Sequence, residues 1–144
     1  MNHEEAVRTF YDVMWNTYDK SVIPALFHED FTFRGSLGEL RTGHAGFADY
    51  VDMVHGALER FRCDIEQLVV EGDVACARMM FSGIQRGALL GHPPTGRQVR
   101  WAGAAMFTFR GERIADLWVL GDLYALERQL TGSPAGREGA DPVR

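Results

Sequence analysis

The sequence predicts one α+β domain: a cone-shaped α+β barrel, with a strongly curved antiparallel sheet packed on N-terminal helices. Apolar residues recur at helical spacing in the first half of the chain, and long alternating segments typical of strands follow from Phe61 onward. Helices that are segregated from the strands and cover one face of an antiparallel sheet define the α+β class. Long strands that curve around such a helical layer leave a cone with an open mouth.

The length of 144 residues suits one hydrophobic core, which we assign to residues 1–132. Residues 133–144 are rich in Gly, Pro and Ala, and we expect a disordered tail there. A hydrophobic share of 46% and a charged share of 24% are typical of a globular protein. The net charge of −5 disfavours nucleic acid as a partner, because that partner needs a basic face. The sequence has no apolar run of the roughly 18 residues that a membrane span needs and no secretion-signal pattern, so we expect a cytoplasmic protein without a membrane partner.

Helices are expected at both ends of the chain. Residues 3–17 form the first, with an apolar stripe that includes Phe10 and Met14. A short second helix covers about residues 21–27, and a third runs from about 44 to 58. The last helix covers about residues 123–130.

Strands are expected between these helices. A short one covers residues 31–34, and a glycine-rich loop follows it to residue 43. Residues 62–70 and 74–85 form a hairpin across Glu71-Gly72-Asp73, a tight-turn sequence. Residues 98–109 and 114–121 form a second hairpin across residues 110–113. Cys63 and Cys76 fall in these strands without metal-ligand spacing, and we expect two core thiols.

Asp122 stands where the last strand meets the last helix. With the period-2 alternation of a strand, Trp118, Leu120 and Asp122 share one face. The carboxylate is therefore a helix N-cap, a group at the lip of an apolar pocket, or both. A helix N-terminus favours a negative charge whereas an apolar pocket disfavours one. That balance suits a general acid/base near neutral pH, so Asp122 is the candidate catalytic residue.

The second hairpin supplies candidate pocket walls. Its turn predicts that Trp101 and Phe107 share a face with Trp118 and Leu120. The small residues 103–105 leave room there for a flat ligand to stack, or for close packing of a helix.

Further candidates for contact with a small hydrophobic ligand come from the first half of the chain: Met14, Trp15, Phe33, Arg34, His44 and Tyr50. Arg34 and Phe33 are neighbours in the expected strand, so their side chains point to opposite faces of the sheet. Arg34 therefore either points inward, where it could hold an enolate or carboxylate, or lies exposed. The histidines form no set with carboxylates at metal-ligand spacing, and we expect no metal site and no cofactor.

Several short stretches together resemble the SnoaL-like polyketide cyclases of the nuclear transport factor 2-like superfamily. They are Trp15-Asn16-Thr17-Tyr18-Asp19, Phe27-His28-Glu29-Asp30-Phe31, Glu71-Gly72-Asp73-Val74 followed by Arg78, Gly91 through Val99, and Ile114 through Asp122. The resemblance spans residues 4–132 and implies an intramolecular aldol-type ring closure without metal or cofactor. It places the general acid/base just before the final helix, a position that Asp122 matches. It also implies an aromatic polyketide-like substrate and a homodimer.

Other functions remain open within the same fold. Some relatives carry a histidine on the strand before the aspartate, and residues 97–110 contain none. Hydroxylation-associated proteins, isomerases and hydrolases reuse the cone with an altered pocket. A non-catalytic ligand-binding or dimerisation domain, in which Asp122 only caps a helix, is the alternative from another class.

Overall fold

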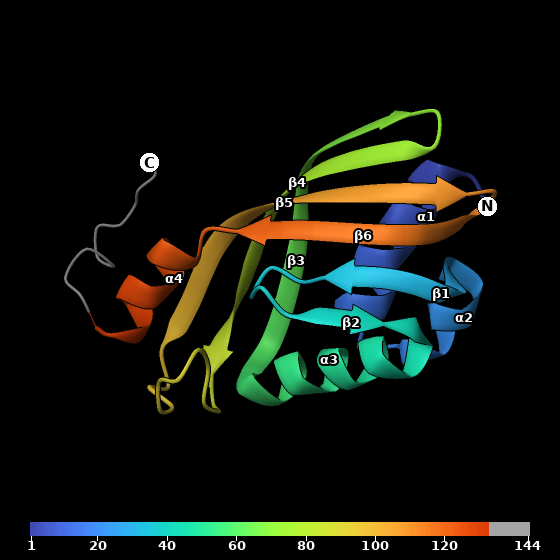
Figure 1. Ribbon diagram of the computed structural model, residues 1–144. Coiled ribbons are helices and arrows are strands. Elements are labelled where there is room, and N and C mark those ends of the chain that lie inside the picture. Colours follow the sequence, from blue (N-terminus) through green and yellow to red (C-terminus); the bar gives the residue numbers. More distant parts are fainter. Residues whose placement is uncertain (133–144) are drawn as a thin grey trace.

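The computed structural model describes residues 1–132 and confirms the α+β class, with helices packed against one curved sheet (Figure 1). The predicted tail, residues 133–144, lies outside the described residues. The elements follow in the order α1 (His3–Thr9), the π-helix η1 (Phe10–Trp15), the 3-10 helix η2 (Lys20–Val22), α2 (Ile23–Leu26), β1 (Phe27–Arg34), β2 (Leu40–Thr42), α3 (Gly43–Ala57), β3 (Leu58–Glu71), β4 (Val74–Gln85), β5 (Gln98–Arg110), β6 (Arg113–Gly121) and α4 (Leu123–Leu130).

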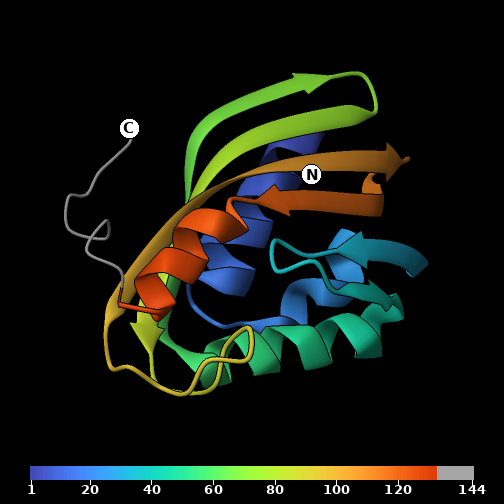
Figure 2. The same ribbon diagram turned by 60° about the vertical axis from the view of Figure 1, so that its left-hand side comes forward.

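The sheet has the strand order β2-β1-β6-β5-β4-β3 within residues 1–132. Strands β2 and β3 are its edges, so the sheet curves but does not close into a barrel. Strands β1 and β6 run parallel, and the other neighbours are antiparallel. The short strand β2 lies inside the segment expected to be a loop. Figure 2 shows how β3, β4 and β5 bend, so that their inner side faces the helices.

The helices fill the concave side of the sheet. Helix α1 passes behind β5 and β6 in Figure 1, and α3 runs below β1 and β2. Phe10, Phe27 and Phe47 come from three different elements and are buried against one another, with ring centroids 5.3 to 5.9 Å apart. Within the described residues, no helix is long and apolar enough to cross a membrane.

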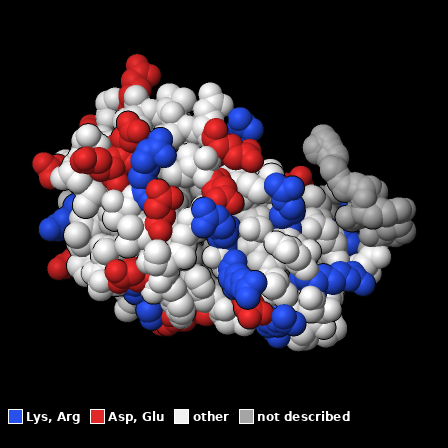
Figure 3. Space-filling model, turned by 180° about the vertical axis from the view of Figure 1, so that it is seen from behind, with Lys and Arg blue, Asp and Glu red and all other residues white. Residues whose placement is uncertain are grey.

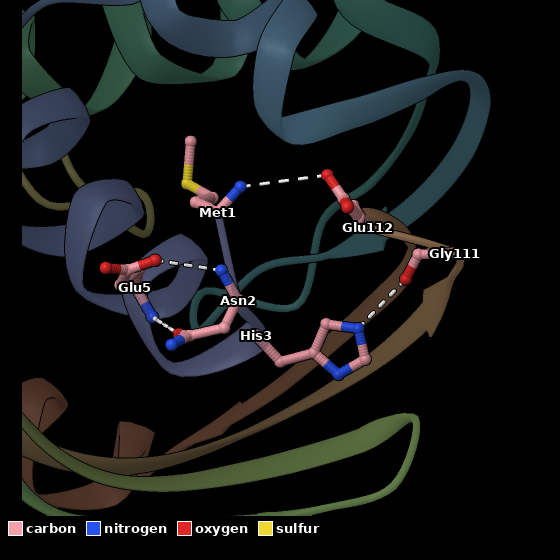
Figure 4. Close-up of polar contacts among 6 residues, drawn as sticks. All are labelled: Met1, Asn2, His3, Glu5, Gly111 and Glu112. Atoms are coloured by element: carbon pink, nitrogen blue, oxygen red, sulfur yellow. Dashed lines mark hydrogen bonds and ion pairs between the residues drawn. The ribbon is translucent and has the colours of Figure 1, made fainter.

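His3 ties the start of α1 to both hairpin turns. Its Nδ1 lies 2.9 Å from the carbonyl oxygen of Gly72. Its Nε2 lies 2.9 Å from the carbonyl oxygen of Gly111, the contact that Figure 4 shows. The imidazole also stacks on Phe109, with ring centroids 3.9 Å apart. Asn2 caps the helix by accepting a hydrogen bond from the backbone N–H of Glu5 at 2.8 Å, within a reciprocal capping box. These contacts fix the direction in which α1 enters the fold.

An irregularity in the β5–β6 hairpin sets which side chains point inward. Phe109 pairs with Ile114, but Thr108 pairs with Asp116, so Ala115 is one extra residue on β6. Because strand side chains alternate, one inserted residue exchanges the two faces beyond it. The alternation expected along residues 116–121 is observed, but the sequence-based matching of β6 to β5 assumed a hairpin without this extra residue and assigned Trp118 and Leu120 to the wrong face of the sheet.

Charged side chains are distributed around the outside. On the face in Figure 3, the Lys and Arg residues of the described chain are interspersed with Asp and Glu. Several form local ion pairs, such as Arg86 with Glu59 at 2.6 Å and Arg62 with Asp64 at 2.7 Å. On this face the basic side chains are not gathered into one patch.

Candidate functional site

A cavity lies between the helices and the concave side of the sheet. Its walls come from η1, α3, the β1–β2 loop and strands β1 and β3 to β6. The lining residues are Phe10, Tyr11, Trp15, Phe33, Ser36, Leu37, Tyr50, Val54, Phe61, Cys63, Phe81, Trp101 and Val119. Most of them are aromatic and none is charged. The empty volume including the opening is about 360 Å³, of which about 20 Å³ admits the centre of a water molecule.

The π-helix η1 turns two adjacent aromatic residues toward this cavity. The backbone N–H of Asn16 donates to the carbonyl of Tyr11 at 2.9 Å, a bond that spans five residues. An α-helix separates neighbouring side chains by about 100°, but the wider turn of η1 buries both Phe10 and Tyr11. Sequence reasoning used the 3.6-residue period and therefore missed Tyr11. No signal in the residues of this segment distinguishes a π-turn from an α-turn.

Two donors in the cavity wall have no hydrogen-bond partner. The hydroxyl of Tyr11 and the indole N–H of Trp101 are buried without a partner, and each residue is only 2% exposed. Burial raises the pKa of Tyr11 well above its ordinary value, and the nearby Cys63 and Tyr50 raise it further. The Tyr11 hydroxyl is therefore protonated at neutral pH and can donate.

Tyr50 lines the same cavity but has partners within the protein. Burial is the main cause of its raised pKa, and hydrogen bonds from the Leu37 backbone and the Ser36 side chain oppose that rise. Burial also raises the pKa of the Cys63 thiol, so the thiol is neutral. Cys63 is in the core as expected, whereas Cys76 is exposed.

Gly121 brings the end of β6 against the cavity wall. A Cβ at this position would lie 2.6 Å from the Ser36 carbonyl oxygen and 3.1 Å from Nε1 of Trp101. Only a residue without a side chain permits this approach. The small residue at position 103 has a similar cause, because a Cβ there would lie 2.5 Å from the Phe81 ring. The space expected for a ligand beside residue 103 is occupied by that ring.

Asp122 follows Gly121 and caps α4. Its Oδ1 accepts a hydrogen bond from the backbone N–H of Ala125 at 3.1 Å, and the residue is exposed. It is not among the residues that line the cavity. Of the two roles expected for this carboxylate, the structure places it in the N-cap geometry.

The other candidate residues fall into three groups. Trp15, Phe33, Tyr50 and Trp101 line the cavity. Met14 and Phe107 are fully buried in the core but outside the lining. The remaining four lie elsewhere: Arg34, His44, Trp118 and Leu120.

Trp118 and Leu120 lie on the outer face of the sheet, 43% and 49% exposed, so the prediction that they face Trp101 and Phe107 is wrong. The extra residue in β6 is the cause, because it pairs Trp118 with the outward-facing Met106 instead of the inward-facing Ala105. Arg34 also lies on this side: its guanidinium lies over the Trp118 ring, 5.4 Å from the centroid, and donates to the carbonyl of Val119.

His44 lies in the first turn of α3 and contacts the backbone of β1. Its Nε2 lies 3.0 Å from the carbonyl oxygen of Phe27, which connects the first turn of the helix to β1. Within residues 1–132, no group of three or more His, Cys, Asp or Glu side chains could hold a metal ion.

A second, wider pocket adjoins the first on the outside. Its empty volume including the opening is about 640 Å³, and it is lined by Leu37, Glu39, Met53, Ala88, Leu89, Leu90 and Gly91. Leu37 lines both spaces. The two spaces therefore adjoin at Leu37, which lies in the β1–β2 loop.

A curved open sheet over helices, with an apolar cavity between them, defines the nuclear transport factor 2-like class of folds. The family model of the SnoaL-like polyketide cyclases matches residues 5–130, and the chain belongs to this family. No match is found among curated proteins.

Solved structures agree with this fold. TsrD from Streptomyces laurentii is 29% identical, with a TM-score of 0.78 over 88% of this chain and 92% of that one. A SnoaL-like polyketide cyclase from Agrobacterium tumefaciens is 21% identical, with a TM-score of 0.78 over 90% and 98%. A protein with a ketosteroid isomerase-like fold from Catenulispora acidiphila is 20% identical, with a TM-score of 0.75 over 99% and 100%.

Proposed function

We propose that this protein is a polyketide cyclase that closes a ring in an aromatic polyketide-like substrate by an intramolecular aldol-type reaction. The observation that carries this proposal is the cavity, whose wall is mostly aromatic and contains no charged side chain. Aromatic walls bind flat ligands by stacking and exclude water from the reacting atoms. Membership of the cyclase family supports the same substrate class.

The reaction needs one group that takes up and returns a proton. A base removes a proton from the carbon between two carbonyl groups, and the resulting enolate carbon bonds to a second carbonyl carbon in the same molecule. The alkoxide formed there then receives the proton. No electrons leave the substrate, so no redox partner takes part.

Asp122 is the carboxylate that we assign to this proton transfer. It directly follows Gly121, whose backbone packs against Ser36 and Trp101 of the cavity wall. The cavity wall itself contains no carboxylate or imidazole. Asp122 is exposed, so the substrate would have to extend out of the cavity to bring its acidic carbon to this carboxylate.

The test is turnover of aromatic polyketide methyl esters by the wild type and by Asp122→Asn. Asn and Asp are equally good N-caps, so this variant keeps the helix cap and removes only the base. Ring closure should fall by about 100-fold or more, the usual effect of losing a general acid/base. Asp116→Asn, which removes a carboxylate of β6 that accepts a hydrogen bond from Thr32, is the control. Equal turnover by the wild type and Asp122→Asn would refute the assignment.

A second candidate is a non-catalytic domain that binds the same ligands. It is favoured by the exposed position of Asp122 and by its hydrogen bond to Ala125. In that case the ligands bind to the wild type and to Asp122→Asn with equal affinity, and neither protein converts them.

We also propose that the protein forms a homodimer through the outer face of the sheet. An exposed apolar row crosses four neighbouring strands through the paired positions Val69, Cys76, Met106 and Trp118. The row is continuous across the sheet, so a second copy related by a two-fold axis would cover it with the same residues.

A further inference from the structure

Tyr11 and Trp101 present an unusual combination in the cavity wall. Each carries a polar group that can donate a hydrogen bond, each is almost fully buried, and neither group has a partner. A buried donor without an acceptor destabilises the folded protein, because it loses its hydrogen bonds to water and gains nothing in return. Tyr50, in the same wall, shows the ordinary situation, with its hydroxyl bonded to the Ser36–Leu37 loop.

Both groups can donate a hydrogen bond. The indole N–H is a donor only, whereas the phenol hydroxyl, which its raised pKa keeps protonated, can donate one hydrogen bond and also accept. Such donors are complementary to oxygen atoms with free electron pairs and no proton of their own. Ketone, ester and enolate oxygens have this character, whereas ammonium groups and hydrocarbons do not.

We propose that the Tyr11 hydroxyl and the Trp101 indole N–H bind the carbonyl-type oxygens of a flat aromatic ligand inside the cavity. The aromatic side chains around them supply the stacking surface, and the two donors select ligands with acceptor oxygens. The identity of the ligand as a ketone or ester rests on the proposed function. Binding of such a ligand by the two donors can be measured without turnover.

The same donors would assist the proposed ring closure. When a carbon loses its proton, negative charge develops on the neighbouring carbonyl oxygen. Fixed donors in an apolar, water-excluded cavity stabilise that charge more strongly than water does. Tyr11 and Trp101 would thus stabilise the enolate oxygen, while the proton moves to Asp122, the carboxylate to which the proposed function assigns it.

The test uses two small probes that differ in one oxygen atom, acetophenone and ethylbenzene. Binding is followed by the indole N–H signals in an NMR titration of the ¹⁵N-labelled protein. The chain contains three tryptophans, and Trp101→Phe identifies the signal of Trp101. Acetophenone should move the Trp101 proton signal downfield, as a new hydrogen bond does, whereas ethylbenzene should not.

Tyr11→Phe measures the contribution of the hydroxyl. Acetophenone should bind about tenfold more weakly to this variant, the effect of one hydrogen bond, and ethylbenzene should bind equally well. The melting temperature of the free variant should stay the same or rise, because the change removes a donor without a partner. Tyr124→Phe, at a position that is 72% exposed, is the control and should change neither quantity.

Three outcomes would overturn the proposal: acetophenone and ethylbenzene binding alike, no binding of acetophenone, or a lower melting temperature of Tyr11→Phe with unchanged affinity. The last result would show that the hydroxyl bonds within the protein. If Asp122 is required for turnover but acetophenone and ethylbenzene bind alike, the proposed function is supported and this inference is refuted. If acetophenone binds selectively but no substrate is converted, this inference is supported and the proposed function is refuted.

Discussion

The imidazole of His55 stacks on the phenol ring of Tyr18, with ring centroids 4.0 Å apart and an interplanar angle of 10°. Its Nε2 is buried without a partner. Burial lowers the pKa of His55, and the Trp15 backbone and Asp52 oppose this shift. A proton therefore binds more weakly to His55 in the folded protein than in the unfolded chain.

This relationship predicts how stability depends on pH. Because the unfolded chain takes up the proton first, the contribution of His55 is present above its unfolded pKa of about 6.5. It is lost as the pH falls from that value through the folded pKa. Urea unfolding at a series of pH values between 7.5 and 5 should show this loss in the wild type. His55→Phe keeps the ring stacked on Tyr18 and should remove the loss in this window.

The paired carboxylates titrate in a different range. Hydrogen bonds from Lys20 and Tyr18 lower the pKa of Asp52, and those from Arg110 and Arg86 lower the pKa of Asp30 and Glu59. Their contributions are present above the unfolded pKa values of about 4 and are lost as the pH falls through the lower folded values. A loss between pH 7.5 and 5 that persists in His55→Phe would contradict the assignment to His55.

Leu37 should control entry to the inner cavity. Its side chain lines both the cavity and the outer pocket. Leu37→Ala should join the two spaces, so that a bicyclic ketone such as 1-tetralone associates faster, as measured by stopped-flow tryptophan fluorescence. Leu90→Ala is the matched control, because Leu90 lines only the outer pocket. Equal association rates for the two variants would exclude Leu37 as the barrier.

Gly121 should tolerate no side chain. A Cβ would lie 2.6 Å from the carbonyl oxygen of Ser36, which is backbone and cannot turn aside. Gly121→Ala should therefore lower the free energy of unfolding by about 1–3 kcal/mol, the range for overpacked sites.

Gly56→Ala is the control for that measurement. Gly56 lies in α3, and a Cβ there would meet no atom within 4 Å. Alanine is favoured over glycine in a helix, so this variant should gain up to about 1 kcal/mol. Chemical denaturation of the two variants and the wild type gives the comparison. A stable Gly121→Ala would mean that the β1–β2 loop moves away without cost.

Met106 should be essential for the proposed dimer. It lies in the middle of the exposed apolar row and is 47% exposed. Met106→Arg places a charge where the two copies would meet, and a buried unpaired charge is costly. Sedimentation equilibrium should show a dimer for the wild type and a monomer for this variant. Leu40→Arg changes an exposed residue at the β2 edge and should leave the dimer intact. A monomeric wild type would refute the dimer itself.

Local patterns determined most of the secondary structure. The hairpin with Glu71-Gly72-Asp73 and the helix that follows Asp122 were predictable because turn residues and side-chain periodicity act over a few positions. The α+β class followed from the order of these elements. Strand β2 was missed because its three residues carry no alternation of their own; they pair with β1 as an edge strand.

The tertiary structure decided the site. The extra residue Ala115 turned Trp118 outward, and the π-turn brought Tyr11 inward; both depend on how distant segments pack. The sequence by itself determined a family, a fold and a carboxylate at the start of the last helix. Only the tertiary structure decided which aromatic side chains meet. One inserted residue in a strand or one wider turn in a helix changes which side chains point inward, although the spacing of apolar residues in the sequence stays the same.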